Sequence, residues 1–185
     1  MKATAPLKLL FTWKPMRGLD QIRSATDAVE ILVSEDPAEI MTLVPDVEVV
    51  IAGHFDAALL QASGKLRWIH AFSGGVNHLL FPELVRSRIP VTCLKGCFDI
   101  AAAEYALAVM LAFSRKLAYD IGQRPARTFV ESEPTELSGK TVGIIGLGNM
   151  GAEIARRCRC FGMRVIGLAR QPRACPPEVS EMLTP

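Results

Sequence analysis

The stretch that decides the fold is residues 141–151, which read TVGIIGLGNMG. Residues 141–145 have the length and apolar character of a buried strand, and residues 150–161 return to helical spacing. The turn between them follows the pattern G-x-G-x-x-G. That pattern is weak alone, but a preceding strand and a following helix are the setting that a dinucleotide-binding fingerprint requires.

In this interpretation each glycine of the turn has a separate role. Gly146 makes the tight turn, Gly148 lets a pyrophosphate approach the backbone, and Gly151 lets the helix lie close to the strand. The unpaired N–H groups and the positive dipole end of the helix then form an anion site. A glycine-rich turn that binds nothing is the alternative. The cofactor-binding residues predicted for the turn are Gly146, Leu147, Gly148, Asn149, Met150 and Gly151.

The end of the next strand, residues 164–168, indicates which cofactor is bound. NAD-binding units carry a carboxylate about 20 residues beyond the glycines, where it accepts a hydrogen bond from the ribose 2′-hydroxyl. Here Ala169 stands at that place, and Arg170 and Arg173 follow it. Two guanidinium groups can pair with a 2′-phosphate, so the sequence favours NADP over NAD. Two solvated arginines in a loop are the alternative.

Outward from this unit, short apolar runs alternate with helical stretches along the whole chain, which is typical of an α/β fold with parallel sheets. Helix 100–119 is apolar almost all round, so we expect it to be buried on several sides. Prolines follow residue 168 closely, and we expect only two strands in the second sheet. The predicted strands are residues 7–13, 28–33, 47–52, 66–72, 91–94, 141–145 and 164–168, and the predicted helices are residues 37–43, 55–62, 76–86, 100–119 and 150–161.

Composition excludes several classes of function. Half of the 185 residues are hydrophobic, and the net charge of +2 indicates no polyanionic partner such as nucleic acid. The N-terminal apolar stretch is too short for a signal peptide, and residues 100–113 are too few to cross a bilayer. We therefore expect a cytoplasmic protein. Five cysteines without a C-x-x-C pair predict reduced thiols that serve packing.

A second glycine turn, Ser73-Gly74-Gly75, ends the predicted strand 66–72. The carboxyl ends of parallel strands are where open α/β sheets bind ligands. Successive backbone N–H groups at such a turn can also form an anion nest. A plain turn is the alternative, because Gly-Gly is common after strands.

Three stretches, in the right order, resemble the D-isomer-specific 2-hydroxyacid dehydrogenases. Residues 66–79 are similar to the family's L-K-W-(apolar)-Q…S-x-G-V-D-H-L segment, and residues 96–105 to the G…V-A-E-H start of its interdomain helix. Residues 137–148 are similar to the L-x-G-K-T-x-G-I-I-G-x-G segment that begins its cofactor domain. The resemblance covers essentially the whole chain.

The resemblance implies a flavodoxin-like parallel-sheet substrate domain followed by an incomplete Rossmann dinucleotide-binding domain. It implies that Ser73, Gly74 and Gly75 present N–H groups to a substrate carboxylate, and that the intact protein is a homodimer through the nucleotide domain. The implied boundaries are residues 1–99 for the substrate domain, 100–121 for an interdomain helix, 122–139 for a connection, and 140–185 for a first, truncated βαβ unit.

By the same resemblance, the intact protein transfers hydride between NAD(P)H and a small 2-oxo or 2-hydroxy acid. The family's catalytic arginine, glutamate and histidine fall beyond the residues present, so no residue here is assigned a catalytic role, and we expect the 185-residue chain alone to be inactive. His54, His70 and His78 match no catalytic position and are interpreted as packed or surface residues. Two alternatives stay open: a non-enzymatic dinucleotide-binding or dimerisation module, and an inactive fragment.

Overall fold

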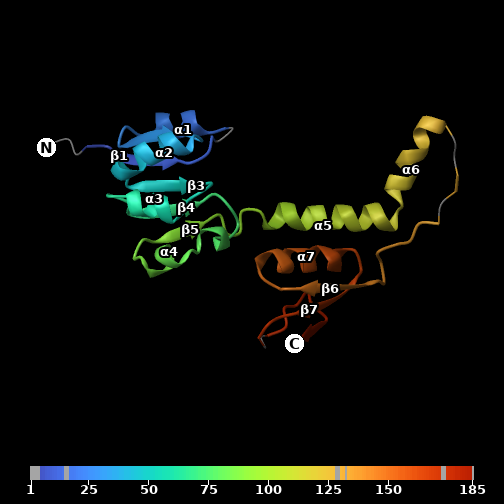
Figure 1. Cartoon of the computed structure of the whole chain (residues 1–185). Coiled ribbons are helices and arrows are strands. Elements are labelled where there is room, and N and C mark those ends of the chain that lie inside the picture. Colours follow the sequence, from blue (N-terminus) through green and yellow to red (C-terminus); the bar gives the residue numbers. More distant parts are fainter. Residues whose placement is uncertain (1–4, 15–16, 128–129, 132, 172–173, 185) are drawn as a thin grey trace. The chain divides into compact units, whose positions relative to one another are not determined.

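The chain forms two units, each with its own parallel sheet (Figure 1). The computed structural model describes residues 5–14, 17–127, 130–131, 133–171 and 174–184. The first unit comprises residues 1–95 and the second residues 96–185. The predicted α/β fold with parallel sheets is confirmed.

The first unit is a five-stranded parallel sheet with the strand order β2-β1-β3-β4-β5. This is the flavodoxin-like order that the resemblance implies. The central strand β3 is buried at every residue, as a parallel sheet covered on both faces requires. The strands are β1 Leu7–Phe11, β2 Val29–Val33, β3 Val49–Ala52, β4 Trp68–Ala71 and β5 Val91–Cys93.

The helices of the first unit lie on both faces of this sheet. Right-handed crossovers place α1 on one face and the later helices on the other, because the step from β1 to β2 runs opposite to the steps that follow. Two buried clusters agree: Leu19 of α1 packs with Phe11 and Ile51, whereas α2, α3 and α4 pack on the other face. The helices are α1 Leu19–Ala25, α2 Pro37–Leu43, α3 Ala57–Ala62 and α4 Pro82–Arg86, with 3-10 turns at Val44–Asp46 and Asn77–Leu79.

The second unit contains a parallel sheet with the order β6-β7-β8. The prediction of two strands in this sheet was wrong, because the chain returns to β7 after its prolines: the Ser180 N–H donates to the Val165 carbonyl at 2.8 Å. A three-residue strand has no periodicity of its own to reveal it. The elements are α5 Asp99–Ser114, α6 Leu117–Gln123, a 3-10 turn at Arg124–Ala126, β6 Thr141–Ile145, α7 Asn149–Cys160, β7 Arg164–Leu168 and β8 Glu181–Leu183.

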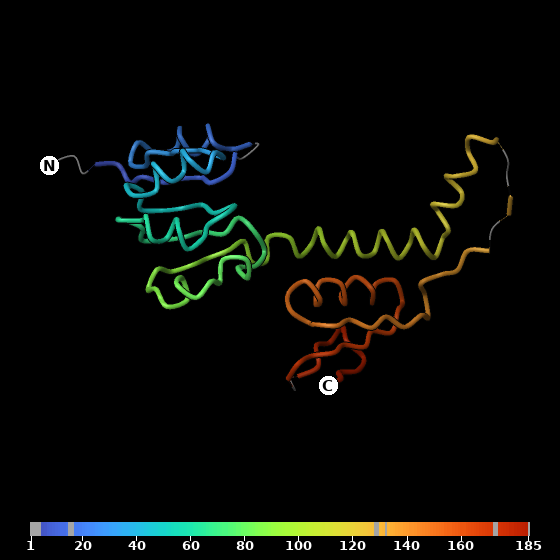
Figure 2. The backbone as a smooth tube through the Cα atoms, viewed as in Figure 1, coloured from blue at the N-terminus to red at the C-terminus, as the bar shows by residue number. Residues whose placement is uncertain are grey.

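The predicted helix 100–119 differs in two ways. It is broken at Lys116, which adopts a left-handed conformation with φ 54°, so that α5 and α6 are separate (Figure 2). It is also not buried on several sides: α5 packs along α7 through Ala103 and Leu107, while Tyr105 and Phe113 are 73% and 81% exposed. Among the described residues of its unit, α5 has α7 as its main neighbour, and Tyr105 and Phe113 are left exposed.

Smaller corrections concern local elements. Helix α1 was not predicted, and the predicted helix 76–86 is a 3-10 turn followed by α4, which begins at Pro82. All five cysteines are free, but the packing interpretation holds fully for Cys158 alone, whose burial raises the pKa of its thiol. Among the described residues, no helix is both long and apolar enough to span a membrane.

Candidate functional site

The turn between β6 and α7 has the geometry of an anion site. Gly146 has a φ of +90°, which favours glycine, and its N–H donates to the Leu168 carbonyl at 2.9 Å. That bond fixes the turn beside the carboxyl end of β7. Gly148 is the N-cap of α7 and offers no side chain to the first N–H groups of the helix. Those groups have no partner within the helix itself, so they are available to a ligand.

Gly151 and Gly148 are glycine for different physical reasons. A Cβ on Gly151 would lie 2.2 Å from the Gly146 carbonyl oxygen, so the close approach of α7 to the turn excludes any side chain. A Cβ on Gly148 would have no atom within 4 Å, and its φ of −65° suits any residue. Packing therefore requires Gly151, whereas Gly148 leaves open space at the helix start.

Leu147 differs from the other predicted residues of the turn. Its side chain is 3% exposed and belongs to the core of the second unit, while Asn149 and Met150 are exposed. Gly167 in β7 makes room for it, since a Cβ there would lie 2.0 Å from the Leu147 Cδ1 atom. Sequence reasoning missed Gly167, although a glycine inside a strand is itself a signal of close packing.

The end of β7 carries the residues predicted to select the cofactor. Ala169 is buried, and its N–H donates to the Leu183 carbonyl at 3.0 Å. Arg170 follows at the surface, two residues beyond Leu168, whose carbonyl accepts the Gly146 N–H. The structure thus brings Arg170 and the glycine turn to the same edge of the sheet. Arg173 lies outside the described residues.

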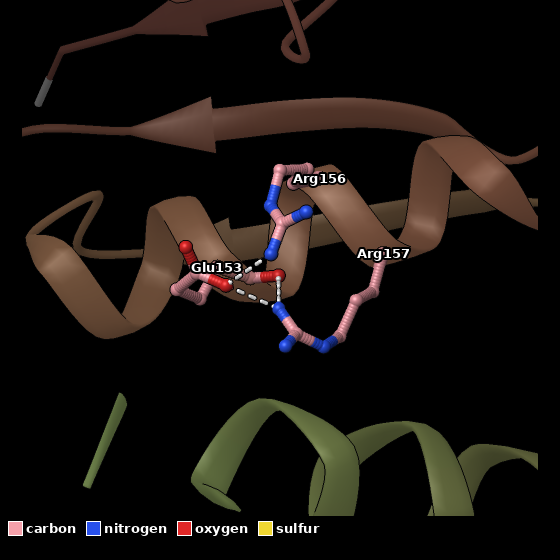
Figure 3. A network of polar contacts seen from close by, with 3 residues as sticks. All are labelled: Glu153, Arg156 and Arg157. Carbon is pink, nitrogen blue, oxygen red and sulfur yellow. Dashed lines mark hydrogen bonds and ion pairs between the residues drawn. The ribbon is translucent and has the colours of Figure 1, made fainter. Parts of the chain in front are cut away.

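An acidic side chain lies one turn into α7, and two arginines neutralise it (Figure 3). Glu153 accepts hydrogen bonds from the side chains of Arg156, at 2.8 Å, and Arg157. The Arg157 guanidinium also donates to the Glu153 carbonyl at 3.1 Å. The two guanidinium groups, Arg156 first, hold the pKa of Glu153 below its usual range. This carboxylate is therefore a paired charge near the anion site.

The turn Ser73–Gly75 at the end of β4 makes its hydrogen bonds through its carbonyl groups. The Leu94 N–H donates to the Ser73 carbonyl at 2.9 Å, and the Ser73 hydroxyl donates to the Gly75 carbonyl at 2.7 Å. The Cys93 thiol lies 4.0 Å from the Gly74 carbonyl. Within the described part of the chain, the N–H groups of Ser73, Gly74 and Gly75 have no protein acceptor. Such a turn can bind an anion.

The three histidines occupy three different settings. The Nε2 atom of His54 lies 3.4 Å from the Asp56 carboxylate, whose pKa is lowered first by the N–H of Leu59 and then by His54. The Nδ1 atom of His70 lies 2.8 Å from the Thr92 hydroxyl. His78 is exposed on the 3-10 turn after Gly75.

The fold and the β6–α7 turn define an α/β protein whose second unit carries a Rossmann-type βαβ arrangement. Residues 107–183 match the family described as D-isomer specific 2-hydroxyacid dehydrogenase, NAD binding domain. The D-3-phosphoglycerate dehydrogenase of Archaeoglobus fulgidus is 31% identical over 157 residues, which are 80% of this chain and 29% of the relative. The glyoxylate reductase/hydroxypyruvate reductase of Mus musculus is 36% identical over 138 residues, which are 71% of this chain and 42% of the relative.

The solved structures agree on the fold. The glyoxylate reductase from Paecilomyes thermophila superposes with a TM-score of 0.82 at 20% identity, covering 98% of this chain and 61% of the other. The match identifies residues 107–183 as similar to the NAD-binding domain of the D-isomer-specific 2-hydroxyacid dehydrogenases. The chain spans less than half the length of the two curated relatives named above.

Proposed function

We propose that the protein is an oxidoreductase that moves a hydride between NADP(H) and a small 2-oxo or 2-hydroxy acid. In this proposal the first unit is the substrate domain, in which Ser73–Gly75 binds the carboxylate, and the second is the dinucleotide-binding domain. One observation carries the proposal: both turns end parallel strands and offer backbone N–H groups to an anion. In the first turn these groups have no acceptor among the described residues, and in the second they lie at a helix start.

The residues at the end of β7 support NADP rather than NAD. No carboxylate stands at Ala169 to accept a hydrogen bond from a ribose 2′-hydroxyl or to repel a 2′-phosphate. Arg170 is exposed at the edge that carries the glycine turn, where its planar guanidinium can pair with a phosphate. With NADP(H) bound at this edge of the sheet, its nicotinamide would supply the hydride chemistry, while Gly148 and the first N–H groups of α7 would hold the pyrophosphate.

Binding by the 185-residue chain tests the carboxylate turn directly. A Cβ on Gly75 would have no atom within 4 Å, so substitutions there should leave the fold unchanged. Gly75→Asp places a carboxylate beside the N–H groups and should weaken the binding of lactate, measured by calorimetry, at least tenfold, while the neutral isostere Gly75→Asn serves as the matched control. Equal affinities in the two variants would remove Ser73–Gly75 from the proposal.

Turnover tests whether the 185-residue chain can catalyse the reaction by itself. None of its residues is assigned an acid/base or carbonyl-polarising role, and each such group contributes a factor of about 100 or more. The 185-residue chain should therefore bind NADPH without reducing glyoxylate or hydroxypyruvate. Reduction at a rate typical of enzymes would contradict this. NADPH binding with no affinity for any 2-oxo acid would instead favour a non-enzymatic dinucleotide-binding module.

We also propose that the intact protein is a homodimer through its second unit. The apolar side chains of Phe113 and Ile145, which are 81% and 87% exposed, support an association of this unit. Sedimentation of the 185-residue chain should show self-association that Phe113→Glu weakens, with Phe113→Leu as the apolar control. A monodisperse monomer that melts in one cooperative step would argue against it.

A further inference from the structure

The first unit contains a cavity of about 400 Å³ on the face of its sheet that carries α1. Phe11, Ile51 and His70 form one row of its wall, because β1, β3 and β4 pair in that register. Trp13 and Phe72 lie two residues further along their chains and point to the same face, since side chains alternate along a strand. The cavity therefore sits on the last rows of the sheet, at its carboxyl edge.

The aromatic end of the cavity is tightly arranged around one glycine. The rings of Trp13 and Phe72 lie with their centroids 4.7 Å apart at an angle of 42°. A Cβ on Gly53, at the end of β3 between them, would lie 2.8 Å from the Trp13 Cδ1 atom. The absence of a side chain at Gly53 lets the indole lie against the strand end and reach Phe72.

The cavity and the proposed carboxylate turn are contributed by neighbouring residues of the chain. Phe72 lines the cavity and Ser73, the next residue, begins the turn. The Phe72 N–H donates to the Ala52 carbonyl at 3.3 Å, which fixes this junction to β3. The chain therefore passes directly from the aromatic end of the cavity to the proposed carboxylate turn.

The size and polarity of the cavity indicate what fits. A cavity of about 150 Å³ already accepts benzene, so the volume here is sufficient for an aromatic ring. Aromatic pairs are more favourable than their buried area alone predicts, and Trp13 and Phe72 provide such partners. The His70 side chain is held in position in the cavity wall, because its Nδ1 atom lies 2.8 Å from the Thr92 hydroxyl. The same hydroxyl accepts a hydrogen bond from the Trp68 indole at 2.9 Å. Arg17 adds a cation to the lining, which suits an anionic ligand.

We propose that this cavity receives the side chain of the substrate, and that the substrate is a 2-oxo or 2-hydroxy acid with an aromatic ring on C3. The inference rests on the proposed function, because it needs the carboxylate at Ser73–Gly75. It goes further by setting this chain apart from enzymes whose substrate, such as glyoxylate, has no side chain. Trp13 and Phe72 are then the residues that determine specificity.

The experiment compares phenyllactate with lactate, which share the carboxylate and the 2-hydroxyl group and differ by the ring. Calorimetric titration of the 185-residue chain should give a dissociation constant at least tenfold lower for phenyllactate. In Trp68→Phe, Trp13 is the one tryptophan left, and phenyllactate but not lactate should change its fluorescence. Phe72→Ala should remove most of the preference and leave the lactate affinity within twofold. Phe161→Ala, which truncates an exposed phenylalanine of the second unit, is the matched control.

The possible outcomes distinguish a failure of this inference from a failure of the proposed function on which it rests. If both acids bind equally and Gly75→Asp weakens both, the carboxylate turn stands and the aromatic cavity is rejected. If neither acid binds, the turn itself is rejected, and the inference with it. The inference also fails if Phe72→Ala leaves the preference unchanged, or if the branched acid 2-hydroxy-4-methylpentanoate binds as tightly as phenyllactate.

Discussion

The two glycine turns of this chain, Ser73–Gly75 after β4 and Gly146–Gly151 after β6, use glycine under different constraints. At the second turn, Gly151 touches the backbone of Gly146, and a twelve-residue helix follows at once. At the first turn, Gly75 has open space around it, and a 3-10 turn of three residues follows. The first turn is therefore free to be shaped by a ligand, while the second must first satisfy the packing of α7.

Gly151→Ala should have the largest effect, because it tests the packing side of this comparison. The new methyl group would meet the Gly146 carbonyl and must push α7 away from β6. We expect a loss of about 1–3 kcal/mol in the free energy of unfolding, measured with urea, together with loss of NADPH binding. Gly143→Ala in β6, where a Cβ has open space, is the control. Equal stability of the two variants would mean that α7 does not lie as close as described.

Gly148→Ala tests the ligand side of the same turn. The free chain has space for the methyl group, so the melting temperature should stay unchanged. The methyl group would, however, stand where the pyrophosphate approaches the backbone, and NADPH affinity should fall at least tenfold. Gly75→Ala is the reciprocal variant: it should leave NADPH affinity intact. If Gly148→Ala binds NADPH normally, the pyrophosphate does not lie at this helix start.

The sequence predicted this second turn far better than the cavity of the first unit. Residues 141–145 and 164–168 were predicted with the strand bounds that the structure shows, because strand, turn and helix follow one another locally. Strand β8 was missed because pairing with β7, and not its own sequence, makes it a strand. The break at Lys116 was missed because a lysine gives no local signal for a positive φ.

The cavity could not be predicted for a similar reason. Trp13, Gly53 and Phe72 lie far apart in the sequence and meet only through the strand order of the sheet. Each alone looks like an ordinary core or turn residue. The binding turns, by contrast, are made of neighbouring residues, and the sequence contains their pattern in full.

Arg170→Ala tests the predicted cofactor preference at the end of β7. A charge-assisted bond between arginine and phosphate contributes about 1.5 kcal/mol or more, so losing it should reduce the preference for NADPH over NADH about tenfold. The measurement is the ratio of the two dissociation constants for the 185-residue chain. Arg170→Lys keeps the charge without the planar fork and should retain part of the preference. An unchanged ratio in Arg170→Ala would mean that the guanidinium is solvated.

Glu153→Gln should have the smallest effect, and it concerns how the helix behind the second turn depends on pH. Because Arg156 and Arg157 hold the pKa of Glu153 below its usual value of 4.5 in the folded chain, the ionised carboxylate stabilises the fold at pH values above that usual pKa. That contribution is lost as the pH falls through the lower folded pKa, where the folded carboxylate takes up its proton. The variant lacks the titrating group, so the wild-type excess in melting temperature at pH 7 should be a few degrees at most and should vanish in acid.

Surface ion pairs are weak and screened by salt, so raising the ionic strength at pH 7 should shrink the same difference. Melting curves from pH 3 to 7 at two salt concentrations check this, and a difference that is constant across pH would show that the network of Glu153 with its arginines does not act through charge.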